Sequence, residues 1–80
     1  MPTVALIKGF RFYFFANEHE PIHVHVTKGQ GPLPTAKIAL VPEVSVIKVS
    51  GFSRSDMAKI VKLCEEARED FIEQWKEYFE

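Results

Sequence analysis

The pattern of hydrophobic and polar residues over the first fifty positions is typical of β-strands. Ile22 to Thr27 (IHVHVT) alternates strictly between apolar and polar residues, which indicates a half-buried strand. Apolar or aromatic runs at 4–8, 10–15, 36–41 and 44–49 predict further strands, because glycine, proline or polar turn residues separate them. Residues 1–50 are therefore expected to form an antiparallel sheet of four to five strands.

The rest of the chain has a helical pattern. Apolar residues recur every three or four positions from Met57 to Phe79, and no glycine or proline interrupts them. Ser53 and Asp56 have the spacing of a capping box, so one C-terminal helix is expected over 53–79. Such a helix would be about 40 Å long, whereas a domain of this size is about 30 Å across. We expect an α+β fold with this helix packed on one face of the sheet, and a homodimer that covers the overhanging helix end.

Composition narrows the class of protein further. A chain of 80 residues allows one domain, and its content of 46% hydrophobic and 26% charged residues is close to the globular average. No apolar run reaches the length of a membrane span, so no membrane partner is expected. The lone Cys64 excludes an internal disulfide and suits the reducing cytoplasm, and its place on the apolar stripe predicts a packed thiol. A cytoplasmic single-domain protein is expected.

The net charge of −1 hides an uneven distribution. Residues 1–53 carry five bases against three acids, a net of +2, whereas residues 54–80 carry five bases against eight acids, a net of −3. The rows of acidic residues along the helix repel phosphate. If RNA binds, it is therefore expected on the sheet.

All three histidines lie within seven positions, at His19, His23 and His25. Residues two apart in a strand share a face, so the last two imidazoles are expected to lie together on the open side of the sheet. A register that pairs Tyr13 with His25 would bring further residues to this face, and we prefer it because it buries the three phenylalanines of the neighbouring strand. The residues brought together would be Arg11, Tyr13, Phe15, His23 and His25.

One interpretation of this cluster is a metal site. Imidazoles from His19, His23 and His25 can supply three ligands to zinc, and Glu18, Glu20 or water can complete the tetrahedron.

The other interpretations need no metal. His23 and His25 could work as an acid–base pair while Arg11 holds a phosphate, as in a small ribonuclease. Alternatively, Tyr13 and Phe15 could stack on bases or on a partner side chain, with the histidines donating hydrogen bonds. In the fourth interpretation the histidines only fix the hairpin structurally. The sequence does not choose among these four interpretations, and it does not decide whether the chain is an enzyme.

Several segments resemble one bacterial family, domain of unknown function 4160. They are Met1–Val4, Gly9–Phe12, the block HEPIHVH at 19–25, and the tail from Glu66 to Phe79. The block is similar to the family's His-x-Pro-Pro-His-x-His hallmark, although Ile22 replaces the second proline. The resemblance implies a small protein of bacteria or archaea, often encoded beside a second small family, domain of unknown function 2442. That gene layout is similar to toxin–antitoxin modules, and it implies a protein partner and an RNA-directed role. By the same resemblance His19, His23, His25 and Arg11 are the first residues to test.

Overall fold

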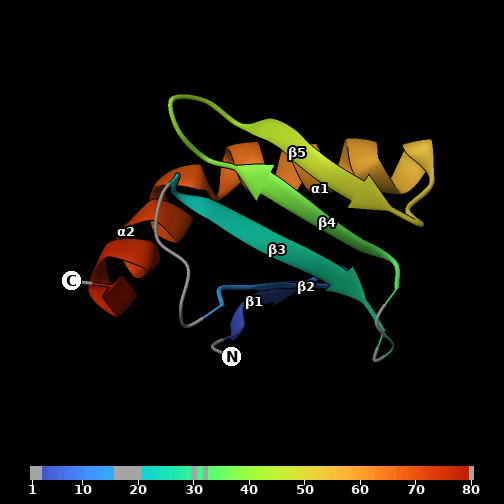
Figure 1. Ribbon diagram of the computed structural model, residues 1–80, viewed down its shortest axis with the longest axis horizontal. Helices are drawn as coiled ribbons and strands as arrows, with labels where there is room; N and C mark the ends of the chain where they lie inside the picture. The colour runs from blue at the N-terminus through green and yellow to red at the C-terminus, as the bar shows by residue number, and fades with distance from the viewer. Residues whose placement is uncertain (1–2, 16–20, 30, 32, 80) are drawn as a thin grey trace.

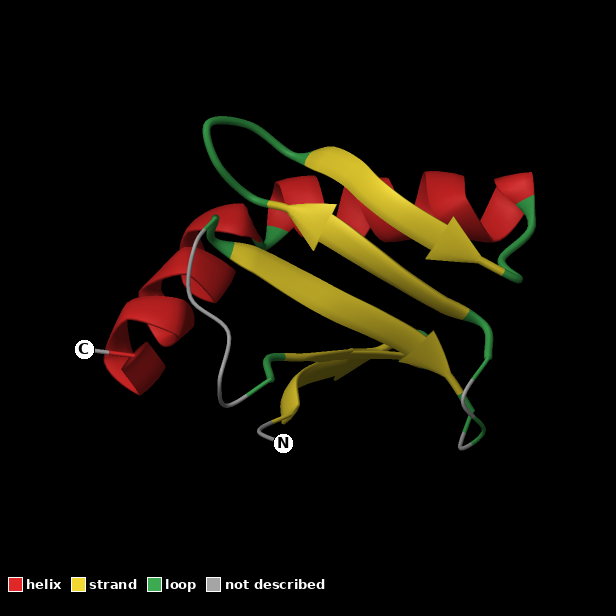
Figure 2. Ribbon diagram, viewed as in Figure 1, coloured by secondary structure: helices red, strands yellow, loops and turns green. Residues whose placement is uncertain are grey.

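The computed structural model describes residues 3–15, 21–29, 31 and 33–79, and these form one sheet and two helices (Figures 1 and 2). The sheet is antiparallel, with its strands in the order β1-β2-β3-β4-β5. The predicted α+β class is confirmed, with five strands in the described part of the chain. The elements are β1 (Thr3–Ile7), β2 (Phe10–Tyr13), β3 (His23–Lys28), β4 (Thr35–Ala39), β5 (Ser45–Ser50), α1 (Arg54–Glu66) and α2 (Arg68–Phe79).

Aromatic side chains of β2 and the residues after it form the centre of the core. Phe10, Phe12 and Phe14 are each at most 2% exposed, and Val24 and Val26 of β3 are fully buried in the same cluster. These side chains lie on the sheet face that the helices cover. Tyr13 pairs with His25 across β2 and β3, so the predicted register is confirmed.

The expectation of one helix over 53–79 is wrong, because the helical tail bends at Ala67. This residue has φ −99° and ψ 9°, outside the helical region, and it separates α1 from α2. The backbone hydrogen bonds continue through the bend: the N–H of Ala67 donates to Leu63 (2.9 Å), and the carbonyl of Ala67 accepts from Phe71 (2.9 Å). The chain therefore changes direction at one residue with its hydrogen-bond ladder largely preserved.

The side chain of Arg68 fixes the direction of the bend. Its Nε donates to the carbonyl oxygen of Leu40 (2.7 Å), and an Nη donates to that of Pro42 (3.0 Å). Both acceptors lie just after β4, so the guanidinium ties the start of α2 to the loop between β4 and β5. α2 then runs beside the end of the sheet at which β3 begins (Figure 1).

The bend removes the overhang on which the homodimer expectation depended. The molecule measures 33 × 24 × 20 Å, with a radius of gyration of 11.5 Å. Phe71 is 1% exposed and Trp75 4% exposed within the single chain, although Tyr78 remains 44% exposed. Most of the apolar tail is thus covered by the sheet of its own chain, and the homodimer through this helix stays a prediction.

β5 lies at an edge of the sheet and is exposed over most of its length. Val46, Ile47 and Val49 are each 45–46% exposed. The pairing with β4 is irregular, since Lys37 pairs with Lys48 and the next residue, Ile38, pairs with Val46. This strand consequently contributes little to the core.

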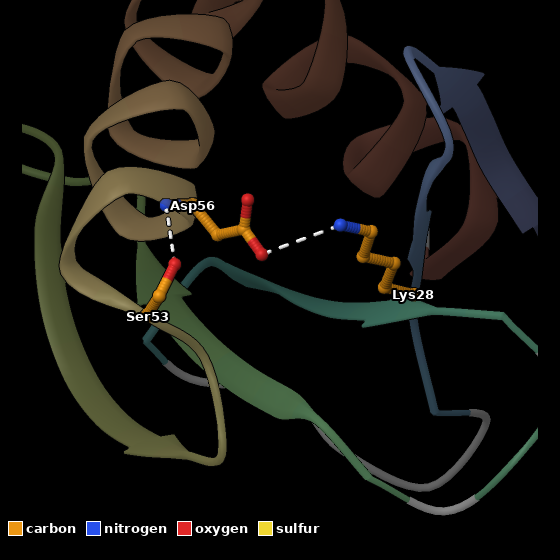
Figure 3. Close-up of polar contacts among 3 residues, drawn as sticks. All are labelled: Lys28, Ser53 and Asp56. Atoms are coloured by element: carbon orange, nitrogen blue, oxygen red, sulfur yellow. Dashed lines mark hydrogen bonds and ion pairs between the residues drawn. The ribbon is translucent and has the colours of Figure 1, made fainter.

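α1 begins at a capping residue, as the sequence predicts. Ser53 is the N-cap, and its Oγ accepts a hydrogen bond from the backbone N–H of Asp56 at 3.1 Å (Figure 3). In the part of the chain that the structure describes, neither helix is long and apolar enough to cross a membrane.

Replacing Arg68 by alanine is expected to lower the free energy of unfolding by about 1–3 kcal/mol, because two carbonyl groups lose a charged donor. Urea unfolding followed by the fluorescence of Trp75, the chain's single tryptophan, measures the change. Arg54→Ala is the matched control, since Arg54 is exposed, and it should cost less than about 0.5 kcal/mol. Equal losses in the two variants would contradict the role of Arg68.

Cys64 gives the fold a defined response to alkaline pH. The thiol is fully buried, and burial, with a smaller effect of Glu65, raises its pKa from 9.0 to about 12. The unfolded chain releases this proton near pH 9 and the folded chain retains it, so stability falls as the pH rises from about 9 towards 12. Under reducing conditions, the stability advantage of the wild type over Cys64→Ala should shrink by about 1 kcal/mol between pH ~7.5 and pH ~10. An advantage that stays constant in urea unfolding would refute this.

Candidate functional site

The face of the sheet opposite the helices, here called the outer face, carries a row of polar and aromatic residues. Tyr13 pairs with His25, His25 with Lys37, and Lys37 with Lys48. Directly paired residues project to the same side of a sheet, so these four side chains form a line from β2 to β5. α1 lies behind this face in the view of Figure 1.

His23 is held inside the protein. Its Nδ1 donates to the carbonyl oxygen of Pro21 at 2.6 Å, and its ring lies 5.1 Å from the ring of Trp75. The residue is 2% exposed. The expectation that this imidazole stands on an open face is therefore wrong, because α2 bends around the end of the sheet and brings Trp75 against it.

His25 is packed between aromatic rings. Tyr13 stacks on it at 5.4 Å with an interplanar angle of 23°, and Phe15 meets it at 4.3 Å in an edge arrangement. His25 is 9% exposed and Tyr13 6% exposed, so these two rings are also less open than expected. Phe15 remains half-buried. The register brings the predicted aromatic and imidazole side chains together, and their mutual contacts cover them.

Arg11 and Thr27 lie directly opposite each other on the outer face beside this cluster. The guanidinium of Arg11 is 5.4 Å from the centre of the Tyr13 ring, a cation–π distance. Arg11 Nε and Thr27 Oγ1 are both buried and have no hydrogen-bond partner among the described residues. Buried polar atoms without partners are costly, so these two atoms lower the stability of this part of the sheet.

A cleft of about 300 Å³ opens on the β3–β5 part of the outer face. His25, Thr35, Lys37 and Lys48 contribute its polar lining. Two ammonium groups, an imidazole and a hydroxyl can all donate hydrogen bonds, and none of the described lining residues is acidic. This donor set favours an anion.

The predicted zinc site falls largely outside the described residues. His19, Glu18 and Glu20 belong to the segment 16–20, which the structure does not describe. The rings of His23 and His25 are 5.0 Å apart. Among the described residues, no group of three histidine, cysteine, aspartate or glutamate side chains is placed to hold a metal. The zinc interpretation stays a prediction.

Sequence reasoning missed the part of the site that lies on β4 and β5. Thr35 and Lys37 stand two apart in β4 and therefore share a face, which is a visible signal. Placing them beside His25 required the pairing of β3 with β4. Placing Lys48 also required the irregularity between β4 and β5, which shifts the register by one residue. The strand pattern alone contains no sign of that shift.

Comparison with known proteins finds the same family that the histidine block resembles. No curated protein and no solved structure matches the chain. A family model, described as domain of unknown function (DUF4160), matches residues 9–76, which include β2 to β5, both histidines of β3 and almost all of the helical tail. The chain therefore belongs to the DUF4160 family.

Proposed function

We propose that the protein binds single-stranded RNA on its outer face, as one half of a two-gene module of the toxin–antitoxin type. The observation that carries the proposal is the cleft on this face, because its described polar lining, His25, Thr35, Lys37 and Lys48, consists of hydrogen-bond donors without a carboxylate. Phosphate is the anion that such a set fits, since ammonium groups and hydroxyls are common phosphate ligands.

The shape of the charged surface favours a polymer over a single phosphate. The line from Tyr13 to Lys48 crosses four strands, which at the usual strand spacing is about 14 Å. Arg11 extends the positive surface along β2. A strip of cations of this length can follow a single-stranded backbone, and the half-buried Phe15 lies beside it.

The charge of the helical tail also favours RNA binding on the outer face. α2 carries four acids, Glu69, Asp70, Glu73 and Glu77, against two bases, a net of −2. A polyanion is repelled by that surface and attracted to the outer face. The family resemblance, with its gene pairs of toxin–antitoxin layout, gives this binding a biological setting.

The two histidines of β3 bind RNA or support the fold in this function, and they do not cleave it. Only His25 lines the cleft, whereas His23 is 2% exposed and bonded to the carbonyl of Pro21. A paired acid–base mechanism needs both imidazoles at the scissile phosphate. The contacts of His23 support the structural interpretation of that residue.

Lys37→Gln/Lys48→Gln should weaken binding to a labelled single-stranded RNA of about 12 nucleotides by on the order of tenfold in low salt. Because two phosphate contacts are lost, the slope of log affinity against log salt should become shallower by about 1.4. Fluorescence anisotropy measured over a salt series gives both quantities. The matched control is Arg54→Gln/Lys76→Gln, which makes the same charge change on the helices.

Three outcomes would overturn the proposal. The first is a wild type that does not bind the RNA, and the second is a control that loses as much affinity as the outer-face variant. The third is an outer-face variant that binds RNA normally but no longer binds the co-encoded small protein, which would make this face a protein-docking surface.

A further inference from the structure

A second pocket lies on the helix side of the sheet. Its volume is about 480 Å³, and it is lined by the β1–β2 turn, the end of β3 and one side of α1. This volume is within the range of small-molecule sites. Four of its lining residues are lysines, Lys8, Lys28, Lys59 and Lys62, and we call it the lysine pocket.

Acidic residues compensate only part of this charge. Asp56 and Glu66 are the carboxylates among the described lining residues, so four positive charges face two negative ones. Lys28 Nζ is 3.4 Å from a carboxylate oxygen of Asp56, the ion pair drawn in Figure 3. Lys8, Lys59 and Lys62 form no ion pair with any carboxylate in the described ranges. With Asp56 paired to Lys28, three lysines and Glu66 remain, so the rest of the lining has a net charge of +2.

Lys8 is held there in an unfavourable backbone conformation. It has φ +53° and is followed by Gly9 with φ +85°, while Ile7 pairs with Phe10. This is a two-residue hairpin turn with both central residues left-handed, in which asparagine followed by glycine is the preferred pair. A lysine at such a position costs conformational energy. An outlier of this kind points to a function of its side chain.

The other walls favour charge recognition over apolar binding. Lys59 and Lys62 stand three apart on α1 and so project from the same side of the helix. The apolar floor offers little surface, since Phe10 is 2% and Leu63 8% exposed. Lysines act as separate point charges, which suits several phosphate groups in a row more than one flat carboxylate.

We propose that the lysine pocket binds a small molecule that carries consecutive phosphate groups. Lys8 from the turn and Lys59 and Lys62 from α1 contact the phosphate oxygens. The Lys28–Asp56 pair bridges β3 and α1 at the wall of the pocket. A nucleoside triphosphate and inorganic polyphosphate share this chemistry, and they differ in whether a base and sugar add affinity.

Titration calorimetry with inorganic tripolyphosphate and with ATP, without divalent cations and at constant ionic strength, tests the site. Lys8→Asn and Lys59→Gln should each weaken tripolyphosphate binding at least about fivefold, since each removes one charge from the pocket. Lys76→Gln, which removes one charge elsewhere on the helices, should change it less than about twofold. ATP binding tighter than tripolyphosphate binding would identify a nucleotide, and the reverse an inorganic chain.

Lys8→Asn separates binding from folding. Because asparagine suits the turn better than lysine, its urea midpoint should be equal to or higher than that of the wild type. A wild type that does not bind tripolyphosphate, or Lys8→Asn and Lys76→Gln variants that bind it equally well, would overturn the proposal. Lys37→Gln/Lys48→Gln on the outer face should retain tripolyphosphate binding, so failure of the RNA proposal is distinguishable from failure of this one. Binding of an oligoglutamate peptide in place of tripolyphosphate would also overturn it.

Discussion

The side chain of Arg68 joins the helical tail to the sheet at the point where the tail changes direction. A straight helix over 53–79 would be about 40 Å long, longer than the 33 Å of the whole molecule. With Arg68 bonded to the carbonyls of Leu40 and Pro42, α2 turns around the end of the sheet and buries Phe71 and Trp75. Trp75 in turn packs against Phe14 and His23, at ring distances of 5.2 and 5.1 Å. The bend of the tail therefore determines the surroundings of the histidine strand.

Strands were predictable from the sequence because their signals are local. Alternation in IHVHVT and three phenylalanines at every second position settle which side chains face the helices, and this also selects the register of β2 and β3. The bend was not predictable, since Ala67 is a good helix former and no glycine or proline stands near it. Its cause is a pair of acceptors 28 and 26 residues away from Arg68, which only the folded chain brings close.

For the candidate site, too, the sequence predicted which residues share a face but not how deeply they are buried. Arg11, Tyr13, Phe15 and His25 share a face as expected, because sharing a face depends on strand period and register alone. Their burial depends on how rings pack on one another and on the path of α2, and neither is encoded in a strand's own sequence. The lysine pocket was not predictable, since it joins Lys8 of a hairpin turn to Lys59 and Lys62 of α1, which are more than fifty positions away.

β5 belongs both to the outer face and to an exposed edge of the sheet, where another chain could pair. An exposed edge strand with three half-exposed aliphatic residues is a template for pairing with another chain. Lys48 stands in the middle of this strand, and a charge at such a position opposes the approach of a second, identical edge. A polyanion bound across the outer face would neutralise that charge. If RNA binds the outer face as proposed, it would therefore also remove the charge of Lys48 that protects the β5 edge, and occupied protein would self-associate more readily than free protein.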